Sequence, residues 1–128
     1  MIIVETRPGL VPLVFDPDDQ ANWCDLSGIS AEVIDLRTLL PLDMATIAAS
    51  VSRTHRALIA HEAVLNGGVG AEIAARIGAE LFDELDAPVL RVGCPFAPIP
   101  FAPELERGLL PGSAQLVRAV RRQMGLAE

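Results

Sequence analysis

Two patterns of apolar residues organise the chain from about residue 30 onward. Short runs rich in apolar residues are strand candidates, and three of them occur at Ala31–Leu36, Ala57–Ala60 and Pro88–Val92. The run at Ala57–Ala60 is near-continuously apolar, as buried parallel strands are. Segments with apolar residues at helical spacing follow the runs, so strand and helix candidates alternate. This alternation predicts an α/β three-layer sandwich, with a mostly parallel sheet and helices on both faces.

Residues at the borders of these segments supply start and stop signals for three helices. Asp43 is a good N-cap for a helix that reaches about Arg53, and Ser113 can cap the last helix. The stretch 94–103 holds four prolines and is expected to be irregular or extended. The second helix is expected to bury one apolar face, which consists of Ile73, Ile77, Leu81, Phe82 and Leu85.

The first 29 residues lack a comparable pattern. Ile2–Glu5 and Leu10–Phe15 are short apolar runs, and Pro12 makes the second run an edge strand or a loop. Residues 16–28 hold turn-forming residues without a clear period, which predicts a loop. We therefore divide the chain into an irregular segment at 1–29 and one folded domain at 30–128.

Composition narrows the classes of partner. Of the 128 residues, 51% are hydrophobic and only 4% are aromatic, so the core is expected to be aliphatic. The net charge of −7 disfavours nucleic acid and anionic membrane as partners. No apolar run approaches the roughly 20 residues of a membrane span, and the N-terminus lacks the pattern of a signal peptide. The cytoplasm is the expected location.

Candidate chemistry centres on the end of the second apolar run. His61 and Glu62 lie where the carboxyl end of a parallel strand is expected, the usual position of ligands in such sheets. Neighbouring residues on a strand face opposite ways, so a structural or interface role is favoured over an acid–base pair. Asn66, Gly67 and Gly68 then open a helix, where an anion can bind. A glycine turn that lets the helix pack closely is the favoured interpretation, and both sets remain candidates for an interface or ligand edge.

Four carboxylates form a second candidate site at the end of the second helix, and they are Glu80, Asp83, Glu84 and Asp86. They fit either docking of a basic partner or a solvated surface, and composition does not separate the two. Cys24 and Cys94 have no neighbouring base in the sequence, so neither is a convincing nucleophile. No catalytic, cofactor-binding or metal-binding residue is predicted for the chain itself.

Several consecutive motifs resemble one known family. In order they are GISAEVIDLRTLLPLD from residue 28, HEAVLNGGVGAEIAARI from residue 61, LDAPVLRV from residue 85 and PIPFAPELERGLLP from residue 98. These motifs, followed by a terminal helix, resemble the C-terminal domain of the transketolase superfamily. The His61–Glu62 pair and the PIPFAP loop are most similar to the beta subunit of thiamine-diphosphate-dependent 2-oxoacid dehydrogenases.

The resemblance implies that the chemistry belongs to other domains. In this family a pyrimidine-binding domain precedes the C-terminal domain, and a partner subunit carries the diphosphate and magnesium motif. This chain has no such GDG motif, and residues 1–29 stand where the family has its first strand and helix. The resemblance therefore implies thiamine diphosphate and magnesium in partner domains, and no cofactor bound by this chain alone.

Two functions fit these features. The first is a structural, assembly and partner-docking domain of a split 2-oxoacid dehydrogenase, in the decarboxylase component. Its partners would be separately encoded thiamine-diphosphate-binding subunits and a lipoyl-bearing acyltransferase docked by the acidic residues. The second is a standalone homodimeric binding module of the same fold without thiamine chemistry. A hydrolase that uses His61 is disfavoured because the chain lacks a nucleophile elbow. Either favoured function predicts an oligomer.

Overall fold

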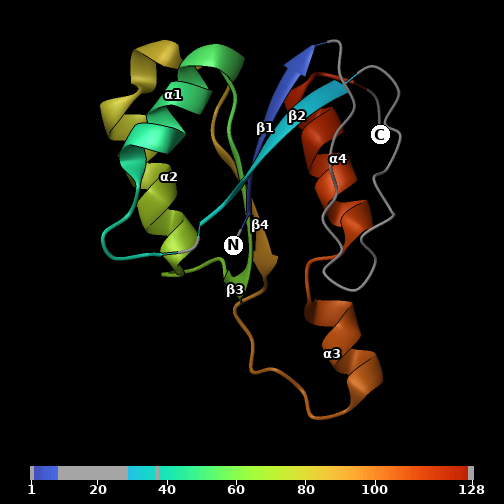
Figure 1. The fold of residues 1–128 in the computed structure, drawn as a ribbon. Helices are drawn as coiled ribbons and strands as arrows, with labels where there is room; N and C mark the ends of the chain where they lie inside the picture. Colours follow the sequence, from blue (N-terminus) through green and yellow to red (C-terminus); the bar gives the residue numbers. More distant parts are fainter. Residues whose placement is uncertain (1, 9–28, 37, 127–128) are drawn as a thin grey trace.

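The computed structural model describes residues 2–8, 29–36 and 38–126. A four-stranded sheet in the order β2–β1–β3–β4 forms the middle of the molecule (Figure 1). The strands are β1 (Ile2–Pro8), β2 (Ile29–Asp35), β3 (Leu58–Val64) and β4 (Leu90–Cys94). The three apolar runs that the sequence singled out are thus strands, and β3 extends four residues beyond its predicted end.

Three of the four strands run in the same direction. β3 and β4 pair in parallel, whereas β1 is antiparallel to both β2 and β3. The mostly parallel sheet is therefore confirmed. The strand at Ile2–Pro8 differs from the irregular segment expected at 1–29, because backbone pairing with two neighbours satisfies its hydrogen-bonding groups. The predicted loop at 16–28 lies outside the described residues, and the division of the chain after residue 29 stays a prediction.

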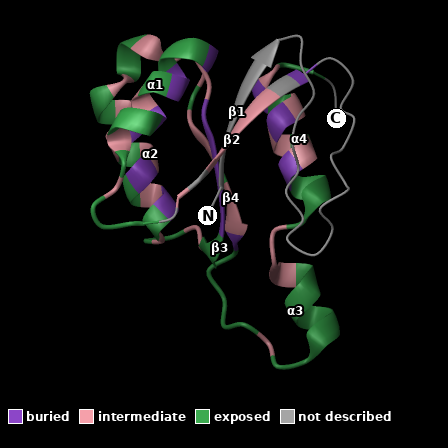
Figure 2. Ribbon diagram, in the orientation of Figure 1, coloured by how far each residue is buried: buried purple, intermediate pink, exposed green. Residues whose placement is uncertain are grey.

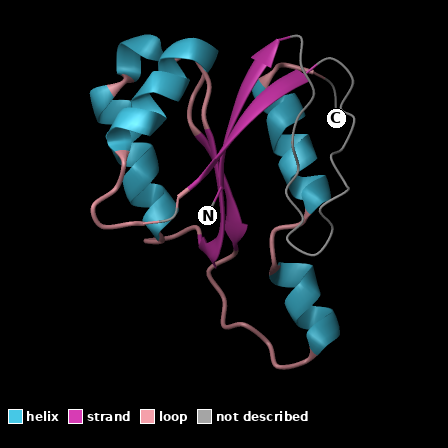
Figure 3. Ribbon diagram, in the orientation of Figure 1, coloured by secondary structure: helices cyan, strands magenta, loops and turns pink. Residues whose placement is uncertain are grey.

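Helices cover both faces of the sheet, which confirms the three-layer sandwich. Figure 3 shows α1 (Met44–Thr54) and α2 (Val69–Glu80) on one side and α4 (Ser113–Gln123) on the other. A short helix, α3 (Pro103–Leu109), lies beyond the end of the sheet. None of the described helices is both long enough and apolar enough to cross a membrane.

Alternating residues of β3 join the two cores. Ile59 packs with α1 and α2, whereas Leu58 and Ala60 pack with α4. Figure 2 shows the buried residues facing the sheet from both helical layers. The first core consists of Ile47, Val51, Ala57, Ile59, Ile73 and Ile77. The second core contains Ile29, Leu58, Ala60, Leu116 and Val120, so both cores are aliphatic as the composition indicates.

The helix boundaries confirm one predicted cap and correct two other predictions. The Asp43 carboxylate accepts a hydrogen bond from the Thr46 N–H at 3.0 Å, as an N-cap does. The N-cap of α4 is Gly112, not Ser113, because the glycine N–H donates to the Gln115 side-chain oxygen at 3.3 Å. Phe82 is 73% exposed, since α2 ends at Glu80 and a 3₁₀ turn (Phe82–Glu84) rotates the ring away from the core.

Candidate functional site

His61 and Glu62 lie near the carboxyl end of β3, but their side chains lie in different environments. The His61 side chain is buried, with a relative exposure of 7%, and Glu62 is exposed. The register of β3 against β4 shifts between Ala60 and Val64, which is a bulge-like irregularity that redirects side chains. The two residues therefore do not form an acid–base pair in one cleft.

The glycine turn after β3 packs directly on the His61 imidazole. A Cβ atom added at Gly70 would overlap the imidazole ring and come within 3.2 Å of the Ile59 side chain. At Gly68 an added Cβ would overlap the Val64 carbonyl oxygen and lie 3.0 Å from the imidazole. The favoured interpretation of the turn, close packing of the helix on the sheet, agrees with this geometry.

The outer part of the same turn is open to solvent. Asn66 and Gly67 are exposed, and Gly67 has a φ of 70°, a left-handed conformation that suits glycine. Gly68 is the N-cap of α2 and supplies no side-chain hydrogen bond to it. The imidazole occupies the space into which Cβ atoms at Gly68 and Gly70 would project.

Burial favours the neutral form of the His61 imidazole, because it lowers the pKa of the ring. Neither ring nitrogen has a hydrogen-bond partner among the described residues. Removal from water is the main cause that lowers the pKa of His61, and the positive charge of Arg91 lowers it further. A neutral imidazole that fills a space beside glycine backbone is a packing element, which fits a structural role for His61.

The protonation of His61 predicts a dependence of stability on pH. The unfolded imidazole has an ordinary pKa near 6.5 and the folded one a lower pKa, so the unfolded chain binds protons first. The free energy of unfolding is expected to fall as the pH drops below this value. Urea denaturation at about pH 7.5 and about pH 5.5 measures the loss.

The matched variant for this prediction is His61→Gln, which cannot titrate. The pKa of Glu32 is lowered by its hydrogen bond from Ser50, and the pKa of Asp43 by its hydrogen bond from Thr46, so both carboxylates titrate at more acidic pH. The variant should therefore lose part of the stability change above about pH 5. An unchanged pH dependence in His61→Gln would show that another group controls it.

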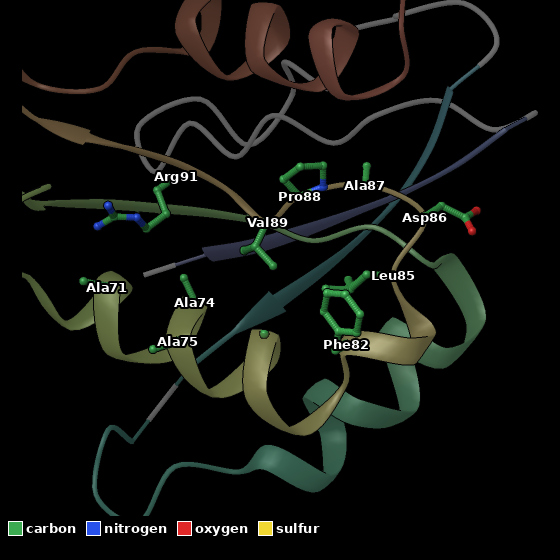
Figure 4. A pocket seen from close by; sticks show the side chains of 11 residues that line it. Ala71, Ala74, Ala75, Phe82, Leu85, Asp86, Ala87, Pro88, Val89 and Arg91 are labelled. Carbon is green, nitrogen blue, oxygen red and sulfur yellow. The ribbon is translucent and has the colours of Figure 1, made fainter.

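A groove of about 630 Å³ runs between α2 and β4 (Figure 4). Small residues of α2 form one wall, and they are Ala71, Ala74, Ala75 and Gly78. Val89 and Leu85 contribute to the apolar lining. Arg91 lies at one end, whereas Asp86 and Phe82 lie toward the other, so the groove carries opposite charges at its ends.

The acidic residues expected to dock a partner lie at the end of α2 and in the 3₁₀ turn and loop that follow it. Glu80 pairs with Arg76 at 2.9 Å and Asp86 pairs with Arg56 at 3.4 Å. Asp83 is exposed on the 3₁₀ turn beside the half-buried Glu84. Half of the cluster is thus already matched by arginines, and Asp83 and Glu84 are its remaining carboxylates.

Sequence reasoning did not identify the groove, although a signal for it exists. Alanines and glycine recur at 71, 74, 75 and 78, a helical spacing that places small side chains on one face of α2. Such a face leaves space beside the helix. The position of Arg91 opposite Asp86 depends on how β4 returns along the sheet, which local spacing does not reveal.

The cysteines offer no reactive thiol within the described residues. Cys94 is buried and free, and burial is the main cause that raises the pKa of its thiol, with the Glu62 carboxylate adding to it. Cys24 lies outside the described residues. Within ranges 2–8, 29–36 and 38–126, no three metal-ligating side chains of His, Cys, Asp or Glu gather.

The layer order and the strand directions define a three-layer α/β domain with a mostly parallel sheet. Residues 21–116 match the family model of the transketolase C-terminal domain, and the chain belongs to that family. It is similar to the pyruvate dehydrogenase E1 component subunit beta of Rickettsia felis, with 44% identity over 104 residues. The resemblance to a dehydrogenase beta subunit is therefore confirmed.

The similarity covers most of this chain and a minor part of each relative. The match to the Rickettsia felis subunit spans 81% of this chain and 32% of the relative. The mitochondrial subunit beta-2 of Oryza sativa subsp. japonica is 47% identical over 102 residues, which is 80% of this chain and 27% of that protein. The subunit beta of Rhizobium meliloti is 41% identical, over 76% of this chain and 21% of its own length. The chain spans about a third or less of these relatives.

Proposed function

We propose that the chain is an assembly and partner-docking domain of the decarboxylase component of a 2-oxoacid dehydrogenase, and that it is not catalytic alone. The observation that carries the proposal is the match of 81% of the chain to only 32% of a pyruvate dehydrogenase beta subunit. The buried His61, separated from the exposed Glu62, agrees with a domain that supports chemistry located elsewhere.

The proposal assigns the cofactors to partner subunits. Thiamine diphosphate and magnesium would be held in partner domains, as the family resemblance implies. The packing of His61 against Gly68 and Gly70 supports this assignment, because a protein side chain fills the space beside these two glycines. The role of this chain would be to complete the subunit and to present surfaces for assembly.

The acidic residues supply the proposed docking site for a lipoyl-bearing acyltransferase with a basic surface. The double change Asp83→Asn and Glu84→Gln is expected to weaken this binding severalfold, and the difference should shrink as salt is raised. Titration calorimetry with the purified acyltransferase of the host measures the affinity. Glu72→Gln removes one charge at the opposite end of α2 and should leave the affinity unchanged. Equal affinities for the double variant and the unmodified chain would contradict a docking role.

A second candidate function, a standalone homodimeric module, is favoured by the groove. Asp86 and Arg91 lie toward opposite ends of it, so a second copy related by a two-fold axis would place each charge near its opposite. The small residues of α2 would let the two helices approach closely. In this case the groove would bury Phe82, and no other subunit would be needed.

Affinity purification of the tagged chain from its native host separates the two functions. Recovery of subunits of a 2-oxoacid dehydrogenase in stoichiometric amounts is the expected result. Recovery of the chain alone, as a monomer or homodimer by light scattering, would contradict the assembly function and favour the homodimeric module.

A further inference from the structure

A segment between β4 and α4 exposes an unusual number of large apolar side chains. We define the projecting segment as residues 95–109, which include α3. Four of its apolar residues have relative exposures of 59% or more, and they are Phe96 at 77%, Ile99 at 59%, Phe101 at 105% and Leu105 at 63%. In Figure 2 this part of the ribbon is almost entirely exposed and extends away from the three layers. Exposed apolar residues concentrated in this way mark an interaction surface.

The projecting segment does not pack into either core of the domain. α3 has seven residues and none of them is buried. A helix this short is not stable by itself in water, because few hydrogen bonds offset the cost of nucleation. The four prolines at 95, 98, 100 and 103 restrict the backbone before and at the start of α3. A surface restricted in this way loses less entropy when it binds, which favours a docking role.

The charged residues of α3 indicate what kind of partner surface would cover the projecting segment. Glu104 and Glu106 lie in the first turn of α3 beside Leu105, and Arg107 follows in its last turn. The structure assigns neither carboxylate an ion pair within the described part of the chain. A complementary surface is therefore apolar at its centre and basic at its rim. A second copy of the chain is a poor match, because both copies would bring the same two carboxylates together.

We propose that the projecting segment docks on a separate folded domain of the same dehydrogenase component, in an apolar groove with a basic rim. This inference rests on the proposed function and names the surface through which the assembly forms. The relatives are about three to four times as long as the part matched here, so in those proteins a domain of this kind stands beside further protein that can pack against it. Interfaces between such domains require apolar surface on both sides.

The test uses the dehydrogenase subunits recovered from the host, expressed and purified as defined proteins. The double variant Phe96→Ser with Phe101→Ser should bind them at least about tenfold more weakly than the unmodified chain, because exposed aromatic anchors contribute most to such interfaces. Leu105→Ser should weaken binding in the same direction. The matched control is Leu126→Ser, which changes an apolar residue that is 46% exposed near the end of the chain and should bind normally.

Hydrogen exchange gives a second measurement that does not depend on the variants. Amides of the projecting segment should become protected when the subunits are added to the unmodified chain. Binding by the unmodified chain with equal affinity for the double variant, or without protection, would overturn the inference and leave the assembly function standing. No binding by the unmodified chain would overturn both. A homodimer that is lost in the double variant would assign the segment to a second copy instead.

Discussion

Replacement of Gly70 by alanine is expected to destabilise the folded chain by about 1–3 kcal/mol, the usual cost of an overpacked core. The new methyl group would overlap the His61 imidazole and approach the Ile59 side chain to 3.2 Å. Both residues are buried, with relative exposures of 7% and 0%, so neither can move into solvent without loss of packing. Since the imidazole fills the space beside α2, the helix must shift away from the sheet.

A glycine in the same helix provides the control for this change. A Cβ added at Gly78 meets nothing within 4 Å, and Gly78 lies inside α2. Gly78→Ala should therefore stabilise the chain by up to about 1 kcal/mol, because alanine favours a helix more than glycine does. Urea denaturation measures both free energies of unfolding. If the Gly70→Ala chain were as stable as the Gly78→Ala chain, Gly70 would not pack against His61 as closely as in this structure.

Truncation of Ile77 to alanine is expected to cost about 2–5 kcal/mol of unfolding free energy, since the cavity left in a rigid core is only partly closed by relaxation. Ile77 has a relative exposure of 0% and lies in the core between α2 and the sheet. Leu105→Ala is the contrasting change, because this side chain is 63% exposed on α3. It should alter the stability of the isolated chain by less than about 0.5 kcal/mol.

Equal losses for the two truncations would contradict the assignment of the core. The contrast also separates two kinds of apolar residue in this chain. Ile77 stabilises the domain itself, whereas Leu105 is expected to act only when a partner covers α3. Thermal denaturation of each variant, with and without the purified subunits, would measure both contributions.

The central elements were predictable because their signals are local. The near-continuous apolar run at 57–60 predicted β3, since buried parallel strands are apolar on both faces. The apolar residues within 31–36 predicted β2, which lies at the edge of the sheet. Asp43 predicted the start of α1, because its carboxylate accepts a hydrogen bond from the N–H of Thr46, only three residues further along the chain. The family motifs extended this prediction to the layer order, which the structure confirms.

Other features depend on tertiary structure and escaped prediction. Phe82 has the spacing of a core residue, but the helix ends two residues before it and the ring turns outward. α3 begins at Pro103. Proline disrupts the interior of a helix but is well suited to the first turn, where no N–H group is needed for a helical hydrogen bond. The groove joins residues of α2 to Arg91 of β4, which are distant in the sequence. The docking role of the acidic residues stays a prediction, since it depends on a partner surface.

Reconstitution of 2-oxoacid decarboxylation tests the central claim most directly. Three reactions contain the purified chain alone, the host subunits alone, or the chain and the subunits together. Each is supplied with thiamine diphosphate, magnesium and a 2-oxoacid, and the release of carbon dioxide is measured. The account predicts no activity for the chain alone and substantial activity only when the chain and the subunits are combined in stoichiometric amounts. Full activity of the subunits without the chain, or activity of the chain by itself, would contradict it.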